Sequence, residues 1–303
     1  DADFGNGAAG INLVDNSTIV IGDSTAAAAT NVVSGNVSFG ILLSNADDVE
    51  LYSTYIGTNK AGTGVLTNDD DSLNITESDN AIVGNTSSAG QNLFASSALA
   101  DAMLNVTNSS VTVKGNVFGT DIATGTTDMC ETSFGVKPNS GALITLGSVA
   151  AGEGNEIAHC SYGIYLGDDD SGNLWRGNNF HSMDLIDVMV ETKTNFPIDN
   201  TTLTMATTTA AIGTTDWADD TLVDVYSRPT AGGVMTYEGT AVVASGAFGL
   251  YMDFAAVDGY KYILNPSDGT DSGQFTAEYD VTADATPPTQ PVVTSSIADT
   301  ATA

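Results

Sequence analysis

Basic residues are scarce in this sequence, which has 7 Lys and Arg against 38 Asp and Glu in 303 residues and a formal net charge of −31. Without a basic patch to neutralise phosphates, nucleic acid and anionic membrane surfaces are not expected as partners. Most carboxylates have no basic side chain to pair with. They depend on water, backbone N–H groups or bound cations, and salt weakens their mutual repulsion.

Long apolar runs are also absent: none approaches the roughly 18 residues of a membrane span, so membrane insertion is not expected. Charged residues supply only 15% of the chain, against about 25% in an average globular domain, and Thr, Ser, Asn and Gly fill the polar remainder. This composition favours strands and turns over surface helices. The sequence opens at Asp1 without Met or a signal segment, as expected of a mature chain after signal removal or of an excised fragment.

A repeat of about 62 residues runs through the first two thirds of the chain. Four landmarks recur three times in one order, and corresponding residues lie 61 to 63 positions apart. The landmarks are marked by Gly22, Gly84 and Gly147; by Asn31, Asn92 and Asn155; by Gly40, Asp101 and Gly163; and by Tyr55, Val117 and Asn179. Such an order in three copies is not expected by chance.

Within each copy, short apolar runs are separated by Gly, Asn, Asp and Ser, which predicts strands and leaves no room for crossover helices. The pattern predicts a solenoid in which each coil hydrogen-bonds to the next and buries its inward residues. With about 20 residues to a coil, each repeat is expected to hold three coils and the whole region about nine. Uneven glycine spacing predicts excursions that form a loop-bearing ridge, at residues 59–72, 121–133 and 183–194.

Two segments, Ala81-Ile82-Val83-Gly84-Asn85-Thr86 with residues 90–93, and Leu146-Gly147-Ser148 with residues 152–157, resemble a known repeat. It is the "IGGT…GAGNVISGN" repeat of bacterial and archaeal surface proteins of the pectin-lyase-like class. Residues 55–59 and 117–121 look like the "NYIGTD.TGT" element of that family. The resemblance covers about residues 10–195 and implies an all-β, right-handed parallel β-helix over residues 1–199.

In that family an immunoglobulin-like β-sandwich follows a stretch like Asn195-Phe196-Pro197. Residues 200–285 alternate at period two with turn clusters between the runs, which also predicts a sandwich, so we place the boundary near Pro197. Residues 286–303 form a proline-rich linker and a strand-like tail.

Acidic triplets are the candidate metal ligands, because Ca²⁺ takes several oxygen ligands. They are Asp69, Asp70, Asp71, Asp168, Asp169 and Asp170. No EF-hand or RTX spacing surrounds them, so solvated acidic turns are favoured and bound calcium is the alternative.

Arg176 is the only arginine of the repeat region and the best candidate for polysaccharide lyase chemistry. The Gly-His-Gly and Arg-Ile-Lys patterns of polygalacturonase-like hydrolases are absent, so we favour Arg176 as an ion-pair partner of the aspartates at 168–170. Trp175 and Trp217 either pack in the interior, which is favoured, or stack on a sugar.

Cys130 and Cys160 match no zinc or thioredoxin spacing. Two buried apolar thiols are favoured over a disulfide between neighbouring coils, and catalysis is the least favoured. His159, next to Cys160, is expected to pack rather than to form a nucleophilic pair.

Together these features favour a non-enzymatic structural or adhesive protein, extracellular or at the cell surface, with copies of itself or surface glycans as partners. Solenoid ends carry unpaired strand edges, and residues 1–10 contain no amphipathic helix, so the first coil is expected to accept a strand if Asp1 is the mature start. Val292, Val293 and Ile297 of the tail are therefore candidates for strand addition that builds a filament or surface layer. The alternative is a carbohydrate-binding or polysaccharide-degrading β-helix protein, tailspike-like or lyase-like.

Overall fold

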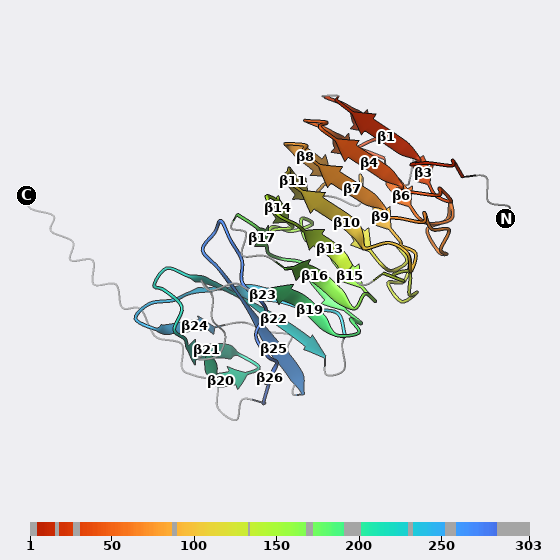
Figure 1. Ribbon diagram of the computed structural model, residues 1–303. Coiled ribbons are helices and arrows are strands. Elements are labelled where there is room, and N and C mark those ends of the chain that lie inside the picture. Colours follow the sequence, from red (N-terminus) through yellow and green to blue (C-terminus); the bar gives the residue numbers. More distant parts are fainter. Residues whose placement is uncertain are drawn as a thin grey trace, which may run out of the picture.

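The computed structural model describes residues 5–15, 18–26, 31–86, 90–132, 134–167, 172–190, 201–229, 233–251 and 259–283. These residues are all-β and contain no helix, as the composition predicts. The part up to Val190, called here the solenoid, forms three parallel sheets, and residues 201–283, the antiparallel region, form two antiparallel sheets (Figure 1).

The chain visits the three parallel sheets in turn, so that one strand from each makes a coil. Sheet 1 contains β1 (Ile11–Val14), β4 (Ile41–Ser44), β7 (Leu73–Thr76), β10 (Ala102–Thr107), β13 (Phe134–Pro138), β16 (Tyr162–Leu166) and β19 (Ile186–Val190). Sheet 2 contains β2 (Val20–Ile21), β5 (Glu50–Leu51), β8 (Ala81–Val83), β11 (Ser110–Val113), β14 (Leu143–Leu146) and β17 (Leu174–Trp175). Sheet 3 contains β3 (Asn31–Val33), β6 (Thr54–Ile56), β9 (Leu93–Phe94), β12 (Val117–Phe118), β15 (Glu156–Ala158) and β18 (Asn179–His181). The arrangement is compatible with a parallel β-helix.

The coils are longer than the sequence predicts. Leu73 pairs in register with Ile41 in the coil before it and with Leu104 in the coil after it, so a coil takes about 30 residues and not 20. The described residues form six coils, with β19 beginning a seventh, and the prediction of about nine coils is wrong. The 62-residue repeat therefore spans two coils and not three.

The two-coil period follows from how neighbouring coils fit together. Gly22 and Gly84 follow strands of sheet 2 with positive φ, which glycine adopts without strain. A Cβ at Gly22 would overlap the carbonyl oxygen of Tyr52 in the next coil, and one at Gly84 would overlap that of Lys114. Glycine is thus required in every second coil, while the coil between contributes the carbonyl and tolerates a large side chain.

One landmark of the repeat is displaced in its middle copy. The sequence match pairs Ile41 with Ala102, whereas the sheet places Leu104 in that column, two residues later. The shift keeps the same side chains inward because strand residues alternate between faces. The third copy is matched correctly, since Leu104 leads through Val136 to Ile164.

Inward residues of the coils stack into one apolar core. Leu73, Leu104 and Ile164 lie in one column and are fully buried. The rings of Phe94 and Phe118 stack with centroids 4.4 Å apart. The aligned columns explain why short strands suffice, because each inward side chain packs on its equivalents above and below.

A ladder of buried asparagines fills the turn between sheets 2 and 3. It consists of Asn92, Asn116, Asn155 and Asn178 from four successive coils. The Nδ2 of each of the first three donates to the Oδ1 of the next, at 2.9, 3.1 and 2.9 Å, and the Nδ2 of all four also donates to a backbone carbonyl of the preceding coil. The ladder satisfies buried polar groups that the turns would otherwise leave unpaired.

The predicted excursions at 59–72 and 121–133 follow β6 and β12 and cover the outer face of sheet 3. Met129 and Ile122 pack with Tyr55, Leu93 and Val117 in a second small apolar cluster. The third predicted excursion, 183–194, is wrong, because β19 begins within it at Ile186 and continues to Val190; positions 191–194 lie outside the described residues.

The antiparallel region contains a sheet of three strands and a sheet of four. The first is β20 (Thr202–Thr207), β21 (Ala210–Thr214) and β24 (Ala247–Tyr251); the second is β23 (Thr236–Val242), β22 (Leu222–Pro229), β25 (Tyr260–Ser267) and β26 (Tyr279–Asp280). A shared core includes Trp217, Val223, Phe248 and Leu264, in partial agreement with the predicted sandwich. The predicted boundary near Pro197 and the tail 286–303 lie outside the described residues.

Candidate functional site

The antiparallel region closes the last coil of the solenoid (Figure 1). Tyr226, Met235 and Phe275 belong to the same apolar core as the inward residues of the coils. The ring of Phe275 meets that of Phe180, on β18, edge to face at a centroid distance of 5.4 Å. One end of the solenoid is therefore sealed by apolar contact within the same chain.

Arg176 lies in this joint and not on an open flank. Its Nε donates to Oδ2 of Asp224 at 2.6 Å and its Nη2 to Oδ1 at 2.5 Å, and the Asp224 side chain is fully buried. The hydrogen bonds with Asp224 raise the pKa of Arg176 further, so the guanidinium stays charged. The expected pairing with the aspartates at 168–170 is not the pairing observed; those three aspartates lie outside the described residues.

Both tryptophans are interior residues, as favoured from the sequence. The Nε1 of Trp175 donates to the carbonyl of Gly273 at 3.1 Å, and the ring is 1% exposed. Trp217 is buried against Phe248 in the antiparallel region. Neither ring is available to stack on a sugar in this arrangement.

Of the first acidic triplet, Asp71 is buried and already satisfied by protein donors. Its Oδ1 accepts from the backbone N–H groups of Asp101 and Ala102, at 3.1 and 2.9 Å, and its Oδ2 accepts from Asn74 and Asn105, at 3.0 and 2.9 Å. Burial raises the pKa of Asp71 despite these hydrogen bonds. The carboxylate ties coil to coil, so the favoured expectation of a solvated turn is wrong for Asp71. Calcium binding at Asp69, Asp70 and Asp71, the alternative, stays a prediction.

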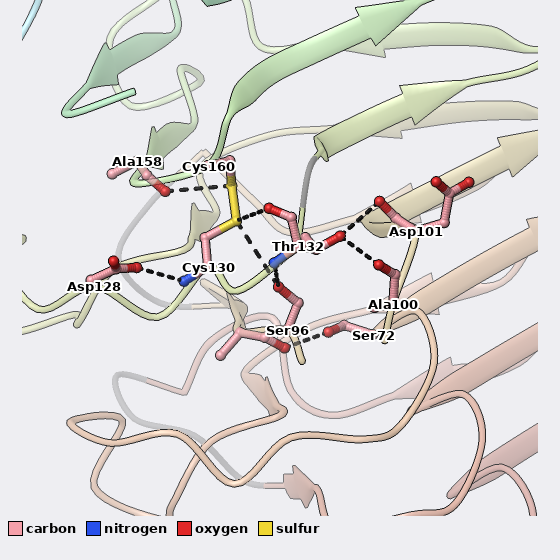
Figure 2. Close-up of a disulfide and its surroundings, with 10 residues drawn as sticks. Ser72, Ser96, Ala100, Asp101, Asp128, Cys130, Thr132, Ala158 and Cys160 are labelled. Atoms are coloured by element: carbon pink, nitrogen blue, oxygen red, sulfur yellow. Dashed lines mark hydrogen bonds between the residues drawn. A yellow bond between two sulfur atoms is a disulfide. The ribbon is translucent and has the colours of Figure 1, made fainter. Parts of the chain in front are cut away.

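Cys130 and Cys160 form a disulfide, so the favoured expectation of two free thiols is wrong (Figure 2). The bond joins the excursion after β12 to the turn after β15, one coil later. With the Cys160 sulfur in this bond, His159 has no thiol beside it to activate. His159 instead meets His181 edge to face, with ring centroids 5.9 Å apart, and His181 lies 3.0 Å from Oε1 of Glu156.

Sequence reasoning missed a second charged cluster at the joint, where Arg228 of β22 meets Asp187 of β19. Arg228 Nη1 lies 3.0 Å from Oδ2 of Asp187, and Arg228 Nη2 lies 2.5 Å from Oε1 of Glu278. Burial raises the pKa of Asp187, and Arg228 opposes that rise. A groove of about 500 Å³ beside the cluster is also lined by Leu185 and Phe275. Residues so far apart in sequence gave no local pattern that could have revealed this cluster.

The opposite end of the solenoid, called here the open end, is formed by β1, β2 and β3. Each of these strands is the last in its sheet and pairs on one side only, with β4, β5 and β6 respectively, within the described part of the chain. Ile11 and Leu13 are only partly buried, although Ile41 and Leu43, their register partners, are 0% and 2% exposed.

A groove of about 430 Å³ lies beside the open end, lined partly by Ile11, Asn31 and Val33. The segment from Gly5 to Gly10 contacts the corner between β3 and β4: Asn6 O accepts from Val37 N at 3.0 Å and Gly10 N donates to Phe39 O at 3.1 Å. The predicted donor residues Val292, Val293 and Ile297 lie outside the described residues. The open end is thus the candidate interaction site.

Among the residues described, no group of three or more His, Cys, Asp or Glu side chains is arranged to hold a metal ion. No helix in the described stretches is long and apolar enough to cross a membrane. Comparisons with known proteins find no matching family model, no matching curated protein and no matching solved structure.

Proposed function

We propose that this chain is a non-enzymatic structural or adhesive protein, extracellular or at the cell surface, that assembles with copies of itself. The finer fold assignments belong to the same proposal. The solenoid is a right-handed parallel β-helix of the pectin-lyase-like class, and the antiparallel region is an immunoglobulin-like β-sandwich.

The observation that carries the proposal is the difference between the two ends of the solenoid. One end is sealed by Phe275 and its neighbours, while at the other end, among the described residues, β1, β2 and β3 each pair with one neighbouring strand and Ile11 and Leu13 are half-buried. Natural solenoids usually cap such edges, because an open sheet edge accepts strands from other chains. A stiff rod with one closed and one open end is suited to end-to-end assembly.

The chemistry of the described residues fits a scaffold. Arg176, the best candidate for lyase chemistry, is paired with the buried Asp224. The disulfide removes the thiols, and Asp71 holds neighbouring coils together. These groups strengthen the rod, and a non-enzymatic role needs nothing more from them.

Carbohydrate binding is the second candidate, and one feature favours it. Phe134, Tyr162 and Tyr165 gather on the outside of sheet 1, with the Phe134 and Tyr165 rings stacked at 4.5 Å and all three side chains half-buried. Lys137 lies over the Phe134 ring at 5.2 Å. Aromatic faces of this kind are suited to surface glycans. Glycan-array binding that is lost in Tyr165→Ala would favour this candidate.

Electron microscopy of the purified chain at high protein concentration and high salt tests the main proposal. We expect ordered filaments or sheets from the intact chain and separate particles from a chain ending at residue 285. Light scattering gives the matching measurement in solution. Monodisperse monomer from both chains under all conditions contradicts the assembly, and polysaccharide turnover that is lost in Arg176→Ala contradicts the non-enzymatic assignment.

A further inference from the structure

Asn-X-Ser/Thr sequons, the acceptor sequences of N-linked glycans, occur at several places in this chain. They begin at Asn16, Asn36, Asn74, Asn85, Asn105, Asn108 and Asn200. Ser and Thr are so frequent in this composition that the number of sequons carries no information by itself. The structure selects among them, because glycan transfer needs an accessible side-chain amide. Asn16 and Asn200 lie outside the described residues.

Four of the described sequons begin with an asparagine whose amide is already bonded. Asn36 is 4% exposed, and its Nδ2 donates to a second buried asparagine at 2.7 Å. The Nδ2 groups of Asn74 and Asn105 both donate to the buried carboxylate of Asp71, at 3.0 and 2.9 Å. The Nδ2 of Asn85 donates to a backbone carbonyl at 3.0 Å. Glycan transfer would have to break these hydrogen bonds, so the fold protects all four amides.

Asn108 differs from these four, because it is exposed and its side-chain amide has no hydrogen-bond partner in the described part of the chain. It lies in the turn between β10 and β11 in the left-handed conformation, with φ of 46°, which asparagine tolerates. Glu77 and Ser140 lie beside it in the coils before and after, and both are exposed. A Cβ at Gly141 would lie 2.2 Å from Oδ1 of Asn108, so this glycine leaves room for the amide.

The equivalent asparagine two coils earlier, Asn45, shows how such an amide is otherwise used. Asn45 follows the register-matched strand β4 and also has a positive φ, of 52°. Its Nδ2 donates to Oδ1 of Asp15, in the coil before, at 2.6 Å. Asn45 does not begin a sequon. The turn therefore bonds the amide of Asn45 to a neighbouring coil and leaves the amide of Asn108, which does begin a sequon, available.

We propose that Asn108 is an attachment site for an N-linked glycan. The inference rests on the proposed extracellular location, because exported chains are the substrates of N-linked glycan transfer. The donor is an oligosaccharide joined through phosphate to a polyprenyl lipid. Nδ2 of Asn108 forms a bond to the anomeric carbon of the first sugar and loses one proton. The bond from that carbon to the phosphate oxygen breaks, and the lipid phosphate leaves with the electron pair.

The position of Asn108 along the solenoid fits the proposed assembly. β10, which precedes it, is the fourth of the seven strands of sheet 1, and the turn lies at the corner between sheets 1 and 2. A glycan is bulky and hydrophilic. At this corner it leaves both ends of the solenoid accessible for end-to-end contact.

Glycosylation of the purified, folded chain tests the inference. The chain is incubated with a purified single-subunit oligosaccharyltransferase that recognises Asn-X-Ser/Thr and with its lipid-linked oligosaccharide. We expect one glycan on each chain, its loss in Asn108→Gln and its retention in Asn105→Gln, the matched control at the nearest sequon. Fragment mass spectra of the tryptic peptide that ends at Lys114 distinguish the two positions. Circular dichroism confirms that both variants fold.

The tryptic peptide of residues 61–114 supplies the comparison without the fold, since it contains four of the sequons. We expect it to accept glycans at Asn105 and at its other sequons as well as at Asn108. A folded chain that stays unmodified while this peptide is modified contradicts the inference. Modification of the folded chain at Asn36, Asn74 or Asn105 in place of Asn108 also contradicts it.

The test is independent of assembly, which microscopy of the unmodified chain measures. A chain that accepts a glycan at Asn108 but never assembles overturns the self-assembly and supports the glycan site. A chain that assembles but does not accept a glycan at Asn108 overturns the glycan site alone.

Discussion

The pairing of Arg176 with Asp224 makes the joint sensitive to a single side chain. Arg176→Ala leaves the fully buried Asp224 carboxylate without its cation, and we expect the free energy of unfolding to fall by about 3–5 kcal/mol. Chemical denaturation measures the change. Lys261→Ala is the control, because its partner Asp280 is exposed, and we expect a change of less than about 1 kcal/mol. An Arg176→Ala effect as small as that of the control would show that the joint is not held by this pair.

Asp187 gives the joint a dependence on pH. Burial raises its pKa above the ordinary 3.8 that it has in the unfolded chain, although Arg228 opposes the rise. The folded state therefore binds a proton that the unfolded state lacks in the window between these two pKa values. The stability that this group contributes is fully present below about pH 4 and is lost as the pH rises through the raised pKa.

Asp187→Asn tests this sign. The variant no longer takes up the proton, so we expect its melting temperature, relative to that of the parent, to be lower at about pH 4 than at about pH 7. Asp280→Asn, at an exposed position, is the matched control and should show no such trend. A relative melting temperature of Asp187→Asn that rises on acidification would mean that the pKa is lowered by Arg228 and not raised by burial.

At the scale of elements, the asparagine ladder connects coils that share few strand residues. Asn116 accepts from the backbone N–H and from Nδ2 of Asn92, at 3.2 and 2.9 Å, and donates to the Val83 carbonyl at 2.8 Å. Asn116→Ala leaves buried groups unpaired, and we expect a loss of about 2–4 kcal/mol in the free energy of unfolding. Asn139→Ala, in a half-buried outer position, should cost about 1 kcal/mol and serves as control. Equal losses of stability in Asn116→Ala and Asn139→Ala would mean that water replaces the hydrogen bonds of the Asn116 side chain.

The elements also show what the sequence could predict. The repeat was visible because a glycine is required in every second coil, where Gly22 and Gly84 lie beneath a carbonyl of the next coil. The same alternation concealed the true coil length, because Tyr52 and Lys114 occupy the equivalent places in the coils between and look unrelated to glycine. The short apolar runs were enough to predict strands. The number of coils could not be predicted without knowing which strands pair in register.

The sites were harder to predict than the fold. Arg176 and Asp224 are 48 residues apart and meet only because the antiparallel region closes the last coil. Predicting the disulfide required the same unknown register. Cys130 and Cys160 are 30 residues apart, which is one coil of the structure and would be one and a half coils at the predicted length. The separation of two residues in the sequence predicts whether they are close in space only when the coil length is known. The predicted coil length of about 20 residues was wrong.

The whole molecule combines a continuous apolar core with an unusually uniform surface charge. The core passes from the coils through Phe180 and Phe275 into the antiparallel region, which favours a single stiff body. The charge of −31 opposes both compaction and association. A rod of this kind is therefore expected to be most stable, and most able to assemble, where salt shortens the range of repulsion.

Salt titration of the parent chain tests this balance. Raising NaCl from about 0.01 M to about 1 M shortens the screening length from about 30 to about 3 Å, and we expect the melting temperature to rise throughout. CaCl₂ and MgCl₂ at equal ionic strength distinguish screening from a specific site. If neither triplet, Asp69–Asp71 or Asp168–Asp170, binds calcium, the two salts act alike. A rise with calcium alone, removed by Asp69→Asn with Asp70→Asn or by Asp168→Asn with Asp169→Asn, would assign calcium ligands to that triplet.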